Sequence, residues 1–262
     1  MMKIFVFAYN RYDTMTTSLM LSNENIEHYV LCHSKEDAEK FKDNGVIGKT
    51  ATLIPTLNPK GLTLQRNFAL DMLENGEWSL FLNDDCVRIT RYKYYFSKMH
   101  KIPNIYDNIG KDFLQPISFE EFIRNCKSLI GISGNTKIHL IGFASNGNSM
   151  FRMKRRSFQS LIDGRCIIVK KGDIRFDTNV NVLEDHYWTA KNLERYGMVL
   201  RDNWILPDFS RNTKGGFGSI DERTPLLQKE AKYIKDMFPY LFDFHDKTGY
   251  HANSQLKFKK FL

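Results

Sequence analysis

Long apolar runs are missing from this chain of 262 residues. No stretch approaches the roughly 18–20 apolar residues that a helix needs to cross a bilayer, so we expect no membrane span. The apolar start at Ile4–Tyr9 is too short for a signal peptide, and Asn10 and Arg11 follow it at once. We therefore expect a cytoplasmic protein, located in the host cytoplasm if it is viral.

Clustered metal-binding side chains are also scarce. The 4 cysteines lie far apart without a CxxC pair, and the histidines show no HxxxH or HxH spacing. These absences argue against a metal site built on cysteine or histidine pairs, and they favour reduced thiols.

Acidic residues are fewer than basic ones. The chain has 30 Asp and Glu against 38 Lys and Arg, which leaves a net charge of +8. This surplus indicates an anionic partner, and phosphate, nucleic acid or an anionic surface would each satisfy it. Disorder is excluded as the main state, because 20 Phe, 12 Tyr and 3 Trp supply ample surface to bury.

Strand-like and helix-like segments alternate at the start of the chain. Short apolar runs rich in β-branched and aromatic residues predict strands, and periodic or capped segments predict helices between them. The predicted strands are Ile4–Tyr9, His28–His33, Ala51–Pro55 and Trp78–Leu82, and the predicted helices are Lys35–Asn44 and Leu62–Leu73. This order predicts an α/β fold, a Rossmann-like domain with a mostly parallel central sheet flanked by helices.

The pattern fades between Cys86 and Ile117, which predicts a long loop or short irregular elements. Further helices are expected at Ser118–Ile130, Glu184–Tyr196 and Asp221–Met237, and further strands at Ile138–Phe143, Ser149–Met153, Cys166–Val169 and Met198–Leu200. No repeat, low-complexity tract or clean linker interrupts the chain. We therefore predict a single domain over residues 1–262.

Three polar residues, Asn83, Asp84 and Asp85, follow the fourth predicted strand. In parallel α/β sheets, ligands bind at the carboxyl ends of the strands. Two adjacent carboxylates repel each other there, and a Mg²⁺ or Mn²⁺ ion would offset the repulsion and hold a diphosphate. A plain turn is the alternative, because these residue types favour turns.

Two helix starts carry further candidate residues. Arg66 would meet a phosphate or a base, and Asn67 offers both a donor and an acceptor. In the pair Glu184–Asp185, one carboxylate is a candidate general base, with His186 as the adjacent alternative. Each pair also has a purely structural interpretation. Arg66 and Asn67 would lie on a solvated helix face, and Glu184 and Asp185 would interact favourably with the dipole at the start of their helix.

Basic and glycine-rich segments offer sites for anions. Lys214 and Gly215 belong to a glycine-rich turn whose N–H groups and ammonium would cradle an anion, although it lacks P-loop spacing. Arg88, Arg91 and Lys93 open a basic, aromatic stretch that would contact a phosphate backbone and stack unpaired bases. The alternative for the glycine-rich turn is a plain mobile loop. The alternative for the basic stretch is a surface whose lysines give solubility and whose tyrosines pack against the protein. Further basic clusters lie at residues 152–156 and 257–260.

Taken in order, these motifs resemble those of nucleotide-sugar glycosyltransferases of the A-type fold. The matching features are an Arg-containing turn after the first strand, a Gly…Arg-Asn helix, an Asp-x-Asp-type strand end and a downstream acidic pair, at residues 7–11, 61–67, 83–85 and 184–185. More narrowly, the chain is similar to the TET-associated glycosyltransferases of phages, which decorate hydroxymethylated pyrimidines in DNA. Asn83 stands where the strict motif has its first Asp, so Asp85 is expected to bind the metal most directly.

The resemblance implies a nucleotide-sugar-binding half at residues 1–85 and an acceptor and catalytic half at residues 86–262. It implies a UDP-sugar as donor, bound by Tyr9, Asn10, Arg11, Arg66, Asn67, Asp84, Lys214 and Gly215. It also implies Mn²⁺ or Mg²⁺, with Asp85, Asn83 and His251 as candidate ligands.

The implied reaction is the transfer of the sugar to 5-hydroxymethylcytosine-type bases in DNA, with Arg88, Arg91 and Lys93 on the acceptor. If the reaction inverts configuration, Asp185 would deprotonate the acceptor hydroxyl, with Glu184 in reserve. If configuration is retained, Asp185 would instead stabilise an oxocarbenium-like centre or bind the sugar.

Three other functions stay open at this point. A glycosyltransferase acting on a cell-surface glycan would also use basic-aromatic patches, at an anionic lipid surface. A nucleotidyltransferase also combines an α/β sheet with paired carboxylates, but it would consume a nucleoside triphosphate. A catalytically silent nucleic-acid-binding module is favoured by Asn83 in place of an Asp.

Overall fold

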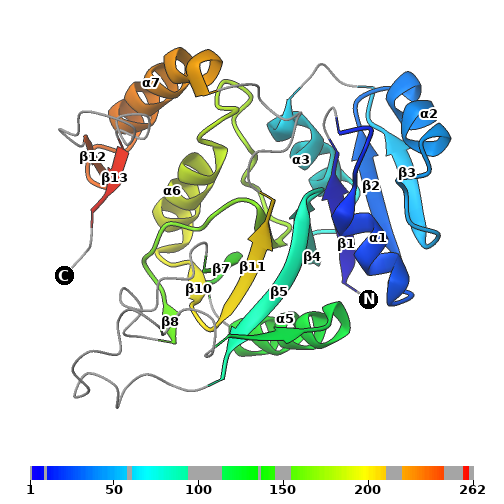
Figure 1. Ribbon diagram of the computed structural model, residues 1–262. Helices are drawn as coiled ribbons and strands as arrows, with labels where there is room; N and C mark the ends of the chain where they lie inside the picture. The colour runs from blue at the N-terminus through cyan, green and yellow to red at the C-terminus, as the bar shows by residue number, and fades with distance from the viewer. Residues whose placement is uncertain are drawn as a thin grey trace, which may run out of the picture.

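The computed structural model of the chain describes residues 2–8, 11–57, 61–93, 114–134, 137–144, 155–210, 220–244 and 256–259. An eight-stranded sheet forms its centre, with the strand order β3-β2-β1-β4-β9-β7-β10-β8 (Figure 1). The strands are β1 (Lys3–Phe7), β2 (His28–Cys32), β3 (Ala51–Pro55), β4 (Trp78–Asn83), β7 (Leu140–Phe143), β8 (Arg156–Ser157), β9 (Cys166–Lys170) and β10 (Leu200–Asp202).

The sheet is mixed, with parallel strands on the N-terminal side. β3, β2, β1 and β4 all run parallel, and so do β7 and β10. β9 runs antiparallel to both β4 and β7, and β8 runs antiparallel to β10. Four of the seven neighbouring pairs are thus parallel, which confirms the predicted α/β fold class. Because β1 and β4 are parallel with Phe7 opposite Asn83, the residues after both strands meet at one edge.

Helices cover both faces of this sheet (Figure 1). They are α1 (Thr16–Asn23), α2 (Lys35–Asp43), α3 (Leu62–Asp71), α5 (Phe119–Ser133), α6 (Glu184–Tyr196) and α7 (Ile220–Met237). The predicted caps are confirmed: the Oγ atoms of Ser34 and Ser118 each accept a backbone N–H three residues on, both at 3.1 Å. Gly197 ends α6 in the left-handed conformation, with φ +79°. The sequence did not predict α1, which has no capping side chain.

Alternate residues of the central strands pack on opposite faces of the sheet. In β1, Ile4 and Val6 join one core together with side chains of α1, α2 and α5. Phe5 and Phe7 join a second core with side chains of α3, α6 and α7. Burial on both faces explains why these strands are continuous apolar runs rather than alternating ones.

A second, three-stranded sheet begins where the sequence predicted a loop or irregular elements. β5 (Cys86–Tyr92) pairs antiparallel with β11 (Ile205–Phe209) on one side and with β6 (Leu114–Ile117) on the other. Its burial does not alternate, since two exposed residues are followed by two buried ones, and its register with β11 shifts near Asp208. This irregularity hides the period of two on which strand prediction depends.

The last described elements form a short hairpin of β12 (Phe242–Phe244) and β13 (Leu256–Phe258), beside α7 in Figure 1. The strand predicted at Ser149–Met153 lies outside the described residues. All four cysteines are free, and all four are buried. Within the part of the chain that the structure describes, no helix is long and apolar enough to span a membrane.

Candidate functional site

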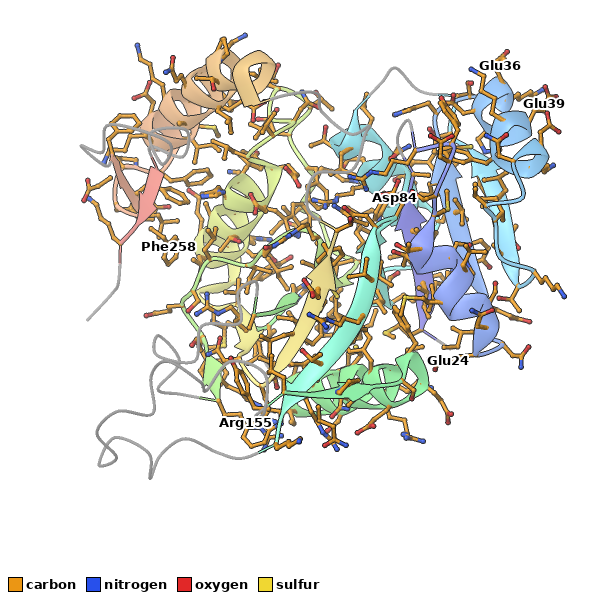
Figure 2. All side chains as sticks on the ribbon, in the orientation of Figure 1. Glu24, Glu36, Glu39, Asp84, Arg155 and Phe258 are labelled. Atoms are coloured by element: carbon orange, nitrogen blue, oxygen red, sulfur yellow. The ribbon has the colours of Figure 1, made fainter. Side chains whose placement is uncertain are left out.

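The acidic turn after β4 is buried at the carboxyl edge of the main sheet. Asp84 and Asp85 follow the last residue of β4, and Figure 2 shows Asp84 near one end of β5. Thr17 of α1 holds the turn with three hydrogen bonds. Its N–H donates to the Asp84 carbonyl at 3.2 Å, its hydroxyl donates to the Asn83 carbonyl at 2.6 Å, and the hydroxyl accepts the Cys86 N–H at 2.8 Å. The motif is therefore a firmly held turn.

Arg11 bridges the two carboxylates of this turn. Its Nη1 contacts Oδ1 of Asp84 and lies 3.1 Å from Oδ2 of Asp85. The guanidinium offsets the repulsion between the neighbouring carboxylates. Burial nevertheless raises the pKa of Asp85, although Arg11 opposes the shift. The sequence assigned Arg11 to the nucleotide, and the structure places its cation directly on the acidic turn.

Two buried oxygens of the turn, Oδ1 of Asn83 and Oδ1 of Asp85, have no hydrogen-bond partner among the described residues. Hard, unpartnered oxygens of this kind suit Mg²⁺ or Mn²⁺. The described ranges contain no group of three or more His, Cys, Asp or Glu residues that could hold a metal ion. Mg²⁺ commonly takes one or two protein ligands and completes its shell with water and substrate phosphates, and the turn fits that kind of site.

The start of α6 forms a second acidic group. Glu184 is the first residue of α6, and its Oε1 accepts from Nη1 of Arg66 at 2.9 Å. Arg66 is only 1% exposed, and its Nη2 donates to the Gly164 carbonyl at 2.6 Å. The rings of Phe7 and Phe176 lie beside the guanidinium. These contacts make Arg66 a positioning residue for Glu184, whereas the sequence placed it against a phosphate or a base.

At about pH 8, where Glu184 is ionised, replacing Arg66 by Leu is expected to destabilise the protein by about 3 to 5 kcal/mol, because it leaves a buried carboxylate without its partner. Urea unfolding followed by circular dichroism measures the change in the free energy of unfolding. The double substitution Arg66→Leu with Glu184→Gln removes the unpaired charge and should recover part of the loss. A single Arg66→Leu variant as stable as the wild type would show that the ion pair does not form.

Burial and the neighbouring Asp185 raise the pKa of Glu184 from 4.5 to about 7, against the opposing effect of Arg66. The unfolded chain releases this proton above about pH 4.5, while the folded chain holds it up to about pH 7. Glu184 therefore makes the folded state less stable as the pH rises through this window.

The Glu184→Gln variant cannot titrate, so the difference in unfolding free energy between wild type and variant isolates this contribution. Urea unfolding at a series of pH values should show the wild type losing stability relative to the variant between about pH 4.5 and 7. Parallel pH curves for the two proteins would contradict the raised pKa of Glu184.

Asp185 pairs with the residue that follows it. Its Oδ1 accepts the backbone N–H of His186 at 2.8 Å and lies 2.8 Å from Nδ1 of that ring. Burial acts to raise the pKa of Asp185, but His186 outweighs burial and the pKa lies below its usual value. Among the described residues, all hydrogen bonds to this side chain end on Oδ1. The second oxygen, Oδ2, is thus left for another partner.

A short segment before β9 lies between the two acidic groups. Arg165 donates to Asp163 from Nε at 3.0 Å and from Nη2 at 2.6 Å, and its carbonyl accepts the Asn83 N–H at 2.9 Å. Burial acts to lower the pKa of Arg165, but Asp163, Asp85 and Asp185 raise it overall. Arg165 is therefore a cation in the electrostatic field of both acidic groups. No sequence motif singled it out, and the one available sign was the Asp-Gly turn dipeptide before a strand.

Gly164 lies at the closest approach of these elements. A Cβ atom at this position would lie 3.0 Å from Nη1 of Arg66 and 3.0 Å from the Cβ of Asp185. A side chain here would press on Arg66 and Asp185, so glycine favours the close packing of α3, α6 and the segment before β9.

A side chain of α7 fixes the residues that directly precede α6. Glu230 of α7 is buried and accepts three consecutive backbone N–H groups, from Asn181 at 2.8 Å, Val182 at 2.9 Å and Leu183 at 2.8 Å. Three donors on one carboxylate fix the residues directly before Glu184. The sequence did not predict this contact, because the two partners are far apart along the chain.

Other predicted residues fall into two groups. Asn67 exchanges two hydrogen bonds with the backbone of Phe176, both at 2.9 Å, and so joins α3 to the loop before α6. The residues Tyr9, Asn10, Lys214, Gly215 and His251 lie outside the described residues. Their assignments stay predictions.

The predicted acceptor residues are spread along β5. Arg88 pairs with Asp208 at 2.9 Å near the start of the strand, Arg91 contacts Glu121 of α5, and the exposed Lys93 follows the last residue of the strand. A strand advances about 3.3 Å per residue, so these cations extend along most of the strand rather than forming one cluster.

No protein-family model matches the chain, and no curated protein sequence matches it. Among solved structures, the chain is similar to a 4-diphosphocytidyl-2C-methyl-D-erythritol synthase from Anaerococcus prevotii. The identity is 10%, the TM-score is 0.39, and the match covers 87% of this chain and 96% of that chain. A likeness this weak carries no functional argument, so function is argued below from the chain's own geometry.

Proposed function

We propose that this protein transfers a sugar from a UDP-sugar to hydroxymethylated bases in DNA, with Mn²⁺ or Mg²⁺ at the donor diphosphate. One observation carries the proposal. The turn at Asn83–Asp85 and the pair Glu184–Asp185 come from distant parts of the chain, and both meet the segment of Gly164 and Arg165 near the carboxyl edge of the sheet. The Arg165 carbonyl accepts the Asn83 N–H at 2.9 Å, and a Cβ atom at Gly164 would lie 3.0 Å from the Cβ of Asp185. Ligands of open α/β sheets bind at this edge.

Several buried polar atoms without partners among the described residues would bind the UDP-sugar and its metal ion. Oδ1 of Asn83 and Oδ1 of Asp85 would hold the metal, which when bound neutralises charge on the departing diphosphate. Two further buried atoms without partners in the described ranges, Oε1 of Gln65 and Oγ1 of Thr56, lie near the ends of β1 and β3. Such atoms suit the hydrogen-bonding groups of a nucleoside. Arg11 would add a fixed positive charge beside the phosphates.

The chemical step assigns distinct roles to the acidic pair. Oδ2 of Asp185 would take the proton of the acceptor hydroxyl, whose oxygen forms a bond to the anomeric carbon of the sugar as the bond to the diphosphate breaks. The low pKa of Asp185, which follows from His186, keeps the carboxylate ionised at neutral pH. Glu184 is occupied by Arg66, so it would shape the site rather than accept the proton.

The acceptor assignment depends on the resemblance and on charge. The net charge of +8 and the cations of β5 favour a polyanion. A base inside a duplex cannot reach a buried carboxylate, so it must leave the stack before the reaction.

Mass spectrometry of hydroxymethylated DNA, incubated with the protein, Mn²⁺ and a panel of nucleotide sugars, tests the proposal. The expected result is a mass increase of one sugar on the modified base, absent with unmodified DNA. Transfer to a glycan but not to DNA would overturn the acceptor, and consumption of a nucleoside triphosphate would overturn the reaction. If UDP with Mn²⁺ failed to raise the melting temperature, the donor would be wrong.

A further inference from the structure

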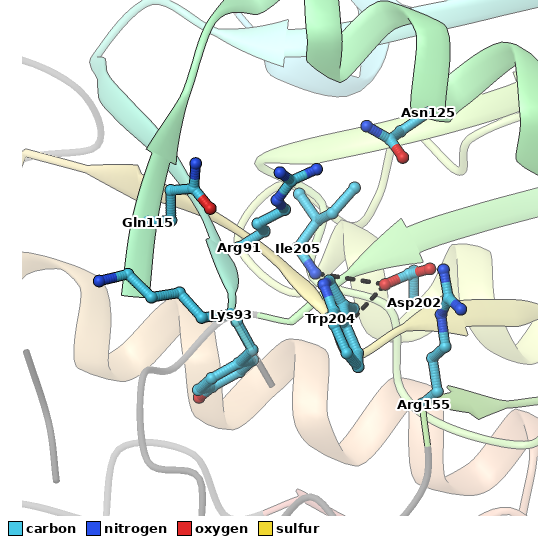
Figure 3. Close-up of a pocket in the computed structure, with 9 residues that line it drawn as sticks. Arg91, Lys93, Gln115, Asn125, Arg155, Asp202, Trp204 and Ile205 are labelled. Carbon is cyan, nitrogen blue, oxygen red and sulfur yellow. Dashed lines mark hydrogen bonds between the residues drawn. The ribbon is translucent and has the colours of Figure 1, made fainter. Parts of the chain in front are cut away.

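A separate cavity of about 270 Å³ lies at the other end of β5 from the acidic turn. Figure 2 shows Arg155, one of its lining residues, far from Asp84 along this strand. β5 has 7 residues, so its two ends lie about 20 Å apart in an extended strand. The cavity is lined by Arg91, Tyr92, Lys93, Gln115, Asn125, Arg155, Asp202, Trp204 and Ile205 (Figure 3).

Hydrogen bonds stabilise the turn that carries Trp204 in the wall of this cavity. Oδ1 of the buried Asp202 accepts the backbone N–H groups of Trp204 at 2.7 Å and Ile205 at 3.2 Å. The Trp204 carbonyl accepts the Tyr92 N–H at 3.1 Å, which joins the turn to β5. The guanidinium of Arg155 lies 5.1 Å from the centre of the indole. The hydrogen bonds fix the backbone that carries Trp204, and Arg155 contacts its ring.

Positive charge dominates the lining. Three of the lining side chains are cations and one, Asp202, is a carboxylate. Arg91 is partly neutralised by Glu121, whereas Lys93 has no carboxylate within ion-pair distance among the described residues. In the view of Figure 3, Lys93 and Gln115 lie on one side of Trp204 and Arg155 lies on the other. The cavity thus combines an aromatic surface, amide groups and a surplus of cations.

We propose that this cavity binds an unpaired nucleotide of the acceptor DNA strand, a few nucleotides away from the base that receives the sugar. The base would lie against Trp204, the phosphates would meet Arg155 and Lys93, and the amides of Gln115 and Asn125 would contact the base edge. A volume of about 270 Å³ lies just below the usual range of ligand pockets, which suits one nucleotide unit. This inference rests on the proposed function, because it takes the nucleic acid acceptor from there.

The test measures fluorescence anisotropy of a labelled, unmodified single-stranded oligonucleotide of about ten nucleotides, without any donor. Trp204→Ala should weaken binding about ten-fold, and Trp204→Phe, which keeps an aromatic ring, should retain most of the affinity. Arg155→Ala should weaken binding and reduce the slope of log affinity against log salt by about 0.7 for each phosphate that Arg155 neutralises. Arg124→Ala, an exposed arginine on α5 that is not part of the lining, is the matched control and should change nothing.

Two outcomes would overturn the inference. One is equal oligonucleotide binding by the wild type, Trp204→Ala and Arg155→Ala proteins. The other is displacement of the oligonucleotide by equimolar thymidine monophosphate, which would mark a site for free nucleotides instead of a DNA strand. Because no sugar donor is present, failure here is distinct from failure of the proposed reaction. If the protein transferred sugar but the variants Trp204→Ala and Arg155→Ala bound the oligonucleotide as the wild type does, only the DNA-binding role of the cavity would be disproved.

Discussion

The substitution Asp85→Asn is expected to lower the rate of sugar transfer by about 1,000-fold or more. It replaces a proposed metal ligand at the diphosphate with an uncharged group of the same shape. The fold should survive, because the side chain keeps its volume and a buried like-charge neighbour of Asp84 is removed. The affinity for DNA should stay nearly unchanged, because the cations that would contact DNA lie on β5 and around the cavity, not in the acidic turn.

Three measurements separate these effects. Transfer is followed by mass spectrometry of the DNA, binding of UDP with Mn²⁺ by calorimetry, and DNA affinity by anisotropy. The matched control is Asp243→Asn, an exposed carboxylate of the C-terminal hairpin that pairs with Lys235 and Lys259. It should retain full activity. If Asp85→Asn kept more than about a tenth of the wild-type rate, the assignment of the metal and diphosphate to this turn would be wrong.

The substitution Asp185→Asn is expected to reduce kcat by about 100- to 10,000-fold, the range for loss of a general base, with little change in KM for the UDP-sugar. Asparagine still presents an oxygen to His186, so the start of α6 should keep its shape. The variant cannot accept the proton at Oδ2. Steady-state kinetics with varied donor and acceptor concentrations separate kcat from KM.

Glu184→Gln is the matched comparison for this prediction. It removes the neighbouring carboxylate but keeps an acceptor for Arg66, so its kcat should fall far less than that of Asp185→Asn. The reverse order would make Glu184 the base. Equal activity of Asp185→Asn and the wild type would contradict base catalysis by the acidic pair. That equal activity would favour a retaining reaction only if the anomeric carbon of the product had the same configuration as in the donor.

The elements that local sequence predicted best are those whose signals are complete within a few residues. The parallel strands β1, β2 and β4 appear as apolar runs because residues on both of their faces pack into the two cores. α2 and α5 were predicted from serine caps that the structure confirms. Gly197 marked the end of α6 because that position needs a left-handed backbone.

The predictions that failed concern pairing between distant segments. β5 looked irregular because its burial pattern depends on β11, more than a hundred residues later in the chain. Arg66 was predicted to meet a phosphate or a base, or to lie on a solvated helix face, but the folded chain encloses it between Glu184 and Gly164. Neither partner is visible in the local sequence of the residue that it contacts.

The sequence alone determined the fold class and the positions of the two acidic groups, because both follow from short-range patterns at element ends. Only the tertiary structure decided how the acidic groups relate. It placed Arg165 in the field of Asp85 and Asp185, and it fixed the residues before α6 through Glu230. It also built the cavity around Trp204. These features depend on burial and on charge at close range, which arise only when distant segments pack together.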